Sequence, residues 1–183
     1  MELVGGRRSH HMWVVRHGES TWNAEGRMQR QISHPPLTAR GTTQAYAAGY
    51  ALQHKQIRRV VSSDAVRATQ TAQAMATVLG VDVLIDERLR ERGFVPGRLV
   101  DARASGREHL EDPTERVRSA LLDIAAMPGL TAVVTHGDIV CAILDMLGTR
   151  DATSGQWASG TDVPNGTAVE VSLRKLRGLA DLA

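Results

Sequence analysis

Val14-Val15-Arg16-His17-Gly18-Glu19-Ser20 is the stretch around which the rest of the chain is organised. The apolar run Met12-Trp13-Val14-Val15 changes abruptly to a cation, an imidazole and a glycine, as a buried strand does where it ends in a turn. In an open α/β sheet, ligands bind at the carboxyl ends of the strands. Arg16 and His17 therefore stand where a site is expected, although a solvated turn after an edge strand explains these residues equally well when they are taken alone.

The composition is that of an ordinary globular protein with one sizeable core. The chain has 183 residues, of which 42% are hydrophobic and 23% charged, and its formal net charge is +2. This small excess fits a small anionic ligand and does not indicate a partner among the nucleic acids, because only three Trp, two Tyr and one Phe are available for stacking on bases. The single cysteine, Cys141, excludes an internal disulfide and a cysteine-built metal site.

No apolar run approaches the length of a membrane span, so no membrane partner is expected. Only four apolar residues follow the basic pair Arg7-Arg8 before the next charge, too few for a signal peptide. We expect a cytoplasmic protein in which residues 1–11 form a disordered tail, residues 12–176 a single domain and residues 177–183 a C-terminal tail.

Strand and helix patterns alternate along the domain, which predicts an α/β fold. The continuous apolar-rich stretch Thr131–Thr135 is typical of a strand that is covered on both faces. We therefore expect a three-layer sandwich, with a mostly parallel central sheet between helices. Thr38 and Ser63 are expected to cap the first and second long helices. The strands are expected near 12–15, 57–61, 81–85, 131–135 and 169–171, and the helices over about 38–53, 64–79, 113–127 and 137–147.

Two of these strands end in the same way, one in Val-Val-Arg-His-Gly and the other in Val-Val-Thr-His-Gly. If both strands are central and parallel, His17 and His136 emerge at one edge of the sheet. Arg16 and Arg67 converge on the same edge, the second from the first turn of a helix. Guanidinium groups suit tetrahedral oxyanions, so this group of side chains predicts a phosphate site.

Histidine at such a site can also act as a nucleophile, and covalent catalysis divides one difficult displacement into two easier ones. The arginines would stabilise charge on the phosphoryl oxygens. The leaving group then needs a proton from a carboxylic acid. Glu91 and Glu87 are the two candidates for this acid.

These motifs together resemble the histidine phosphatase superfamily (phosphoglycerate mutase-like), and the resemblance covers most of the chain. The matching segments are Arg16–Asn23, Gly26–Gln29, Pro36–Gly41, Gln44–Ala45, Ser62–Asp64, Arg67–Ala68, Gln70–Ala72, Leu89–Glu91, Thr135–Gly137 and Asn165–Thr167. The resemblance implies the phosphoglycerate mutase-like fold, no metal and no cofactor, and it suggests a homodimer.

The resemblance also implies a role for each matching residue. His17 would be the phosphorylated nucleophile, and Glu91 would be the proton donor, with Glu87 in reserve. Glu19 would support the loop rather than take part in the chemistry. The phosphoryl group would be bound by Arg16, Arg67 and His136, with Asn23 as a further contact.

The chain departs from the family pattern in three ways. Arg30 stands where small relatives have glycine, and the segment after Glu91 lacks a second acid. The insertion between Glu91 and His136 is also short, which implies a small lid or an open site. The loop 92–110 is rich in arginine and, if it faces the site, favours a leaving group with further negative charge; a solvated basic loop explains it equally well.

The sequence therefore predicts a phosphomonoester hydrolase that acts on a small phosphorylated metabolite through a phosphohistidine intermediate. A phosphoglycerate mutase and a phosphatase for phosphorylated protein side chains are the alternatives. A non-catalytic phosphate-binding module is the last reading, because binding alone does not need both a nucleophile and an acid.

Overall fold

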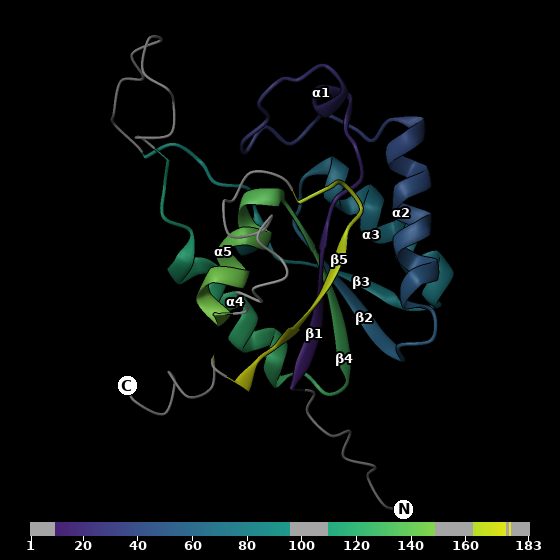
Figure 1. Ribbon diagram of the computed structural model, residues 1–183, viewed down its shortest axis with the longest axis vertical. Helices are drawn as coiled ribbons and strands as arrows, with labels where there is room; N and C mark the ends of the chain where they lie inside the picture. Colours follow the sequence, from purple (N-terminus) through teal and green to yellow (C-terminus); the bar gives the residue numbers. More distant parts are fainter. Residues whose placement is uncertain (1–9, 96–109, 149–162, 175, 177–183) are drawn as a thin grey trace, which may run out of the picture.

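A five-stranded sheet with the strand order β3-β2-β4-β1-β5 forms the centre of the molecule (Figure 1). The computed structural model describes residues 10–95, 110–148, 163–174 and 176. Its elements are β1 (His11–Arg16), α1 (Thr21–Ala24), α2 (Ala39–Leu52), β2 (Ile57–Ser62), α3 (Val66–Leu79), β3 (Asp82–Ile85), the 3-10 turn η1 (Glu87–Leu89), α4 (Thr114–Ala126), β4 (Leu130–Thr135), α5 (Gly137–Leu147) and β5 (Ala168–Ser172).

The sheet is mostly parallel, as the sequence predicted. β1, β2, β3 and β4 run in the same direction, and only β5 is antiparallel, to β1. The register pairs Arg16 of β1 with Thr135 of β4. The residues that follow these two strands, His17 and His136, therefore leave the sheet side by side at its carboxyl edge.

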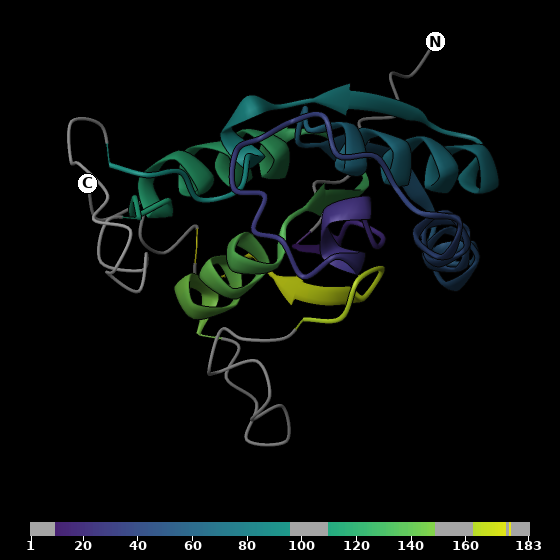
Figure 2. The ribbon, with the colours of Figure 1, turned by 90° about the horizontal axis from the view of Figure 1, so that it is seen from above.

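Helices cover both faces of the sheet, which confirms the expected three-layer sandwich (Figure 2). The side chains of β4 alternate between two cores: Val133 packs with α4 and α5, whereas Ala132 and Val134 pack with α2 and α3. This alternation follows from the two-residue period of a strand. It explains why β4 reads as an uninterrupted apolar run.

The predicted limits of the domain and its two tails stay a prediction. His11 belongs to β1 and pairs with Ser172, so the first strand begins at the expected last residue of the N-terminal tail, one residue before the expected start of the domain. Residues 1–9, 177–183 and most of the loop 92–110 lie outside the described residues. Among the helices that the structure describes, none is both long and apolar enough to cross a bilayer.

Candidate active site

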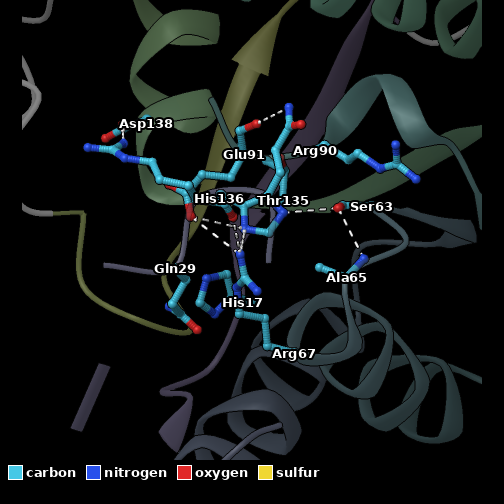
Figure 3. A network of polar contacts seen from close by, with 12 residues as sticks. His17, Gln29, Ser63, Ala65, Arg67, Arg90, Glu91, Thr135, His136 and Asp138 are labelled. Carbon is cyan, nitrogen blue, oxygen red and sulfur yellow. Dashed lines mark hydrogen bonds and ion pairs between the residues drawn. The ribbon is translucent and has the colours of Figure 1, made fainter. Parts of the chain in front are cut away.

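The two histidines meet where β1 and β4 end. Their ring centroids are 5.2 Å apart and the rings are inclined by 67°. Both side chains are buried, and Arg67 lies beside them (Figure 3). The structure thus brings together the residues that the repeated strand endings had placed at one edge.

The backbone holds His17 in one orientation. Its amide donates to the carbonyl oxygen of Thr135 at 2.9 Å, and Nδ1 lies 2.7 Å from the carbonyl oxygen of Gly18. Burial, and then the charge of Arg67, lower the pKa of His17 to about 3. The ring is therefore neutral near pH 7, with its proton assigned to Nδ1 and a lone pair on Nε2.

The loop after His17 packs directly on the start of α2. A Cβ atom on Gly18 would lie 2.2 Å from the carbonyl oxygen of Gly41, so only glycine allows this approach. Glu19 caps the contact, because Thr38 donates to its carboxylate at 2.9 Å and to its carbonyl oxygen through the backbone amide at 2.9 Å. Its contacts are those of a residue that supports the loop, as expected from the sequence.

His136 is fixed from two sides. Its Nε2 lies 2.9 Å from Oγ of Ser63, which points toward it in Figure 3, and its Nδ1 lies 3.3 Å from Nη2 of Arg67. Burial, followed by the charges of His17 and Arg67, lowers the pKa of His136 well below its usual value. His136 is therefore neutral in the free protein.

The expectation that Ser63 caps α3 is wrong. The N-cap of α3 is Ala65, which has no side-chain capping bond, and the amide of Ala65 lies 3.4 Å from Oγ of Ser63. Ser63 contacts His136 instead, a partner 73 residues away along the chain. A local capping rule could not predict this contact, because the hydroxyl of Ser63 bonds to the residue that follows the neighbouring strand, β4.

Arg67 is fully buried and is positioned by two main-chain carbonyl groups. Nη1 donates to the carbonyl oxygen of Ile32 at 2.7 Å, and Nη2 donates to that of Arg30 at 2.9 Å. Nη2 also lies 3.4 Å from Oε2 of Glu91. Because carbonyl groups orient a guanidinium without neutralising it, the charge of Arg67 stays available to an anion.

The structure separates the two candidate acids. The side chain of Glu87 is 71% exposed and pairs with Arg90 at 3.3 Å, away from the histidines. The side chain of Glu91 is 15% exposed and lies 3.6 Å from Nδ1 of His136. Burial, and then the carboxylate of Asp138, raise the pKa of Glu91 above its usual value.

The main chain around Glu91 is tied to two elements of the core. Arg116 of α4 donates to the carbonyl oxygens of Arg88, Arg90 and Glu91. Oγ1 of Thr135, at the end of β4, donates to the carbonyl oxygen of Leu89 at 2.7 Å. These bonds hold an otherwise irregular segment and so place the Glu91 carboxyl beside the histidines.

A cavity of about 200 Å³ opens at this edge of the sheet. Arg16, His17, Asn23 and Glu91 line it. The carboxamide oxygen of Asn23 accepts from the amide of Ser20 and from Nδ2 of Asn165. These two bonds fix the orientation of the carboxamide group, whose nitrogen is a hydrogen-bond donor. Within the described residues, no group of three or more His, Cys, Asp and Glu side chains is arranged to hold a metal ion.

Sequence reasoning missed one further pair at the cavity. Nη1 of Arg30 lies 2.8 Å from Oδ2 of Asp138, in the first turn of α5, and both residues line the cavity. Arg30 was recognised only as a departure from the family pattern. Its partner lies 108 residues later, and no local pattern connects the two positions.

The comparisons with known proteins identify the family. The family model of the histidine phosphatase superfamily (branch 1) matches residues 12–174. The probable phosphoglycerate mutase GpmB of Salmonella choleraesuis (strain SC-B67) is 33% identical over 161 residues, covering 75% of this chain and 74% of the relative.

Solved structures share the fold. A mycobacterial glucosyl-3-phosphoglycerate phosphatase in complex with VO3 is 25% identical with a TM-score of 0.72, covering 90% of this chain and 91% of that chain. Bacillus stearothermophilus YhfR, at 22% identity, has a TM-score of 0.71 over 88% of this chain and 90% of its own, which supports the fold alone. The chain belongs to the histidine phosphatase superfamily (branch 1) and is an enzyme with phosphatase or mutase activity.

Proposed function

We propose that the protein is a phosphomonoester hydrolase that acts on a small phosphorylated metabolite through a phosphohistidine at His17. The observation that carries this proposal is the 2.7 Å contact between Nδ1 of His17 and the carbonyl oxygen of Gly18. With the proton on Nδ1, the lone pair of Nε2 is available for attack. Burial and the charge of Arg67 hold the pKa of His17 at about 3, so this neutral form is present at neutral pH.

In the first step, Nε2 of His17 attacks the phosphorus atom, a P–N bond forms and the P–O bond to the leaving group breaks. Glu91 transfers its proton to the departing alkoxide oxygen, which leaves as an alcohol. The raised pKa of Glu91 supports this role, because it keeps the carboxyl protonated to higher pH than an exposed glutamate.

In the second step, Glu91 is a carboxylate and accepts a proton from water as the water oxygen attacks phosphorus. The P–N bond breaks, inorganic phosphate is released and His17 is neutral again. One acid thus serves both steps, in agreement with the absence of a second acid directly after it in the sequence.

The phosphoryl oxygens would be bound by Arg16, Arg67, His136 and the amide nitrogen of Asn23. The guanidinium of Arg67 is preorganised by the carbonyl groups of Arg30 and Ile32, so little reorganisation is needed as charge develops. A bound dianion also favours the protonated form of His136, opposing the effect of burial.

The test of this proposal measures both turnover and the transfer of the phosphoryl group to the protein. Hydrolysis of para-nitrophenyl phosphate is measured for the wild type and for His17→Ala between mildly acidic and neutral pH, and the stopped protein is tested for an acid-labile, alkali-stable phosphoryl group. We expect turnover and label in the wild type and neither in His17→Ala. His54→Ala is the matched control, because His54 is exposed at the end of α2 and should keep both properties.

A wild type that turns over without forming label on His17 would contradict the mechanism. Turnover is expected to persist in EDTA, and its loss on chelation would refute the prediction that no metal is required.

Mutase activity is the second candidate, because the name of the Salmonella relative carries it. A mutase and a phosphatase share the first step and differ in the acceptor of the phosphoryl group. A single-turnover experiment on protein phosphorylated at His17 distinguishes the two activities, because it measures how much of the phosphoryl group passes to water and how much to 3-phosphoglycerate. Release of inorganic phosphate alone supports the hydrolase, and a phosphorylated glycerate product supports the mutase.

A further inference from the structure

The ion pair between Arg30 and Asp138 has no part in the mechanism above, although it lies at the same cavity. It joins the loop after α1 to the first turn of α5 at a distance of 2.8 Å. The two side chains are only 17% and 32% exposed. Both line the cavity together with Arg16, His17 and Glu91. The pair is therefore shielded from solvent more than a surface ion pair and faces the space that a phosphoryl group would occupy.

The backbone of Arg30 adopts a conformation that favours glycine. Its φ is +47°, in the left-handed region that side chains with a Cβ rarely adopt. The carbonyl of Arg30 accepts from Arg67, and the amide of Ile32 donates to Gln29 at 2.9 Å, so the turn is needed to orient Arg67. These bonds use only main-chain atoms at position 30. They require the conformation but do not explain why arginine is present.

The guanidinium of Arg30 has an unused donor. Its Nε is buried and has no hydrogen-bond partner among the residues that the structure describes. Nε of Arg67, whose guanidinium contacts Glu91 and His136, is also buried and has no hydrogen-bond partner within the described part of the chain. Because Arg30 lines the cavity, an acceptor that enters it can supply the hydrogen bond that the guanidinium of Arg30 lacks, and a tetrahedral oxyanion has several acceptor oxygens.

We propose that Arg30 binds the phosphoryl group as a third arginine, beside Arg16 and Arg67, and that Asp138 is the positioning residue that holds its guanidinium over the cavity. This inference rests on the proposed function. It adds a substrate-binding residue at a position whose backbone conformation favours glycine. Strain that is retained at a residue facing a site points in the same direction.

Asp138 would have a second effect, on the acid. The charged or titratable groups around Glu91 are Asp138 from α5, Arg67 from α3, Arg16 from β1, Arg116 from α4, Arg30 and His136. Asp138 alone among the charges acting on Glu91 raises its pKa. Removing this carboxylate lowers the pKa of Glu91. As the pH is raised, activity that depends on protonated Glu91 should therefore be lost at a lower pH than in the wild type.

The first test uses Arg30→Gly. Glycine adopts the left-handed conformation without strain, which offsets part of the cost of losing the ion pair with Asp138, so the variant should fold. We expect KM for para-nitrophenyl phosphate and the inhibition constant of inorganic phosphate to rise about 10- to 100-fold, the loss of one or two bonds to a charged group. Gln56→Gly is the matched control: Gln56 is exposed, has a φ of +55°, lies just before β2, and should leave both constants unchanged.

The second test separates the two effects of Asp138. Asp138→Asn keeps an oxygen that can accept from Arg30 but removes the charge, so KM should stay within about threefold while the high-pH fall of activity moves to lower pH. Asp138→Ala removes the acceptor as well and should raise KM toward the value of Arg30→Gly. Combining Asp138→Ala with Arg30→Gly should raise KM no further, because the two residues act as a unit.

Phosphate affinity measured by calorimetry makes the inference independent of turnover. If Arg30→Gly binds inorganic phosphate as tightly as the wild type, the inference is overturned, whatever happens at His17. If the wild type binds phosphate, Arg30→Gly binds it more weakly and His17 is never labelled, the binding role of Arg30 stands and the hydrolase mechanism fails.

Discussion

Gly18→Ala is the substitution whose effect can be worked out most directly from the structure. The added Cβ would lie 2.2 Å from the carbonyl oxygen and 2.9 Å from the carbonyl carbon of Gly41. Ordinary contacts of this kind begin at 3.4 Å, so the two segments must separate by about 1.2 Å, the difference between 3.4 and 2.2 Å. Because both atoms belong to the backbone, no side-chain rotation can make room.

The displacement should affect both stability and rate. Overpacking of a close contact costs about 1–3 kcal/mol of unfolding free energy. The carbonyl of Gly18 accepts from Nδ1 of His17, and its amide donates to Oγ1 of Thr71 at 3.0 Å, so the shift reaches the imidazole. A misplacement of about 1 Å at the reacting atoms lowers the rate about 100-fold.

The assay compares kcat/KM for para-nitrophenyl phosphate with the free energy of unfolding in urea. Gly80→Ala is the control, because Gly80 has a φ of +66° and no atom within 4 Å of an added Cβ. It should lose about 1 kcal/mol of stability through backbone strain and keep its activity. A Gly18→Ala protein with wild-type kcat/KM and wild-type stability would refute the close contact between the histidine loop and α2.

Three further perturbations test the site. The free energy of unfolding should fall as the pH decreases below about 6.5, by about 1.4 kcal/mol per pH unit for each of His17 and His136. The reason is that the lowered pKa values of these histidines keep them unprotonated in the folded state, whereas the unfolded chain takes up protons. Urea titrations at several pH values measure the slope, and His17→Gln should reduce it. Glu91→Gln should lower kcat for alkyl phosphates about 10²- to 10⁴-fold and for para-nitrophenyl phosphate by less, and equal losses would argue against an acid role. Ser63→Ala should lower kcat/KM about tenfold by releasing the His136 ring, whereas an unchanged value would mean that packing alone orients the ring.

The sheet and the two histidines could be predicted because their signals are local. An apolar run of strand length marks β1 and β4, and an abrupt polar residue marks the point where each run leaves the core. Parallel pairing then brings His17 and His136 together without further information. Arg67 follows for the same reason, since it lies in the first turn of the helix after the neighbouring strand.

The remaining residues depend on contacts between distant segments. Glu87 and Glu91 are four positions apart in a segment with little regular structure, so no period distinguishes the exposed one from the buried one. Hydrogen bonds from Arg116 and Thr135 to the main chain of this segment decide which glutamate is buried. Ser63 and Arg30 likewise have partners 73 and 108 residues away, which a pattern read along one segment cannot reveal.

The spacing of the two imidazoles is set by the sheet. Neighbouring strands lie about 4.8 Å apart, and the rings, each one residue beyond the Arg16–Thr135 pair, are 5.2 Å apart. A slip of one residue between β1 and β4 would move one ring by about 3.3 Å along the strand and turn it to the other face. The hydrogen bonds between β1 and β4 therefore set the distance between the two histidines, and an inserted residue anywhere in either strand should abolish activity even where the sheet still forms.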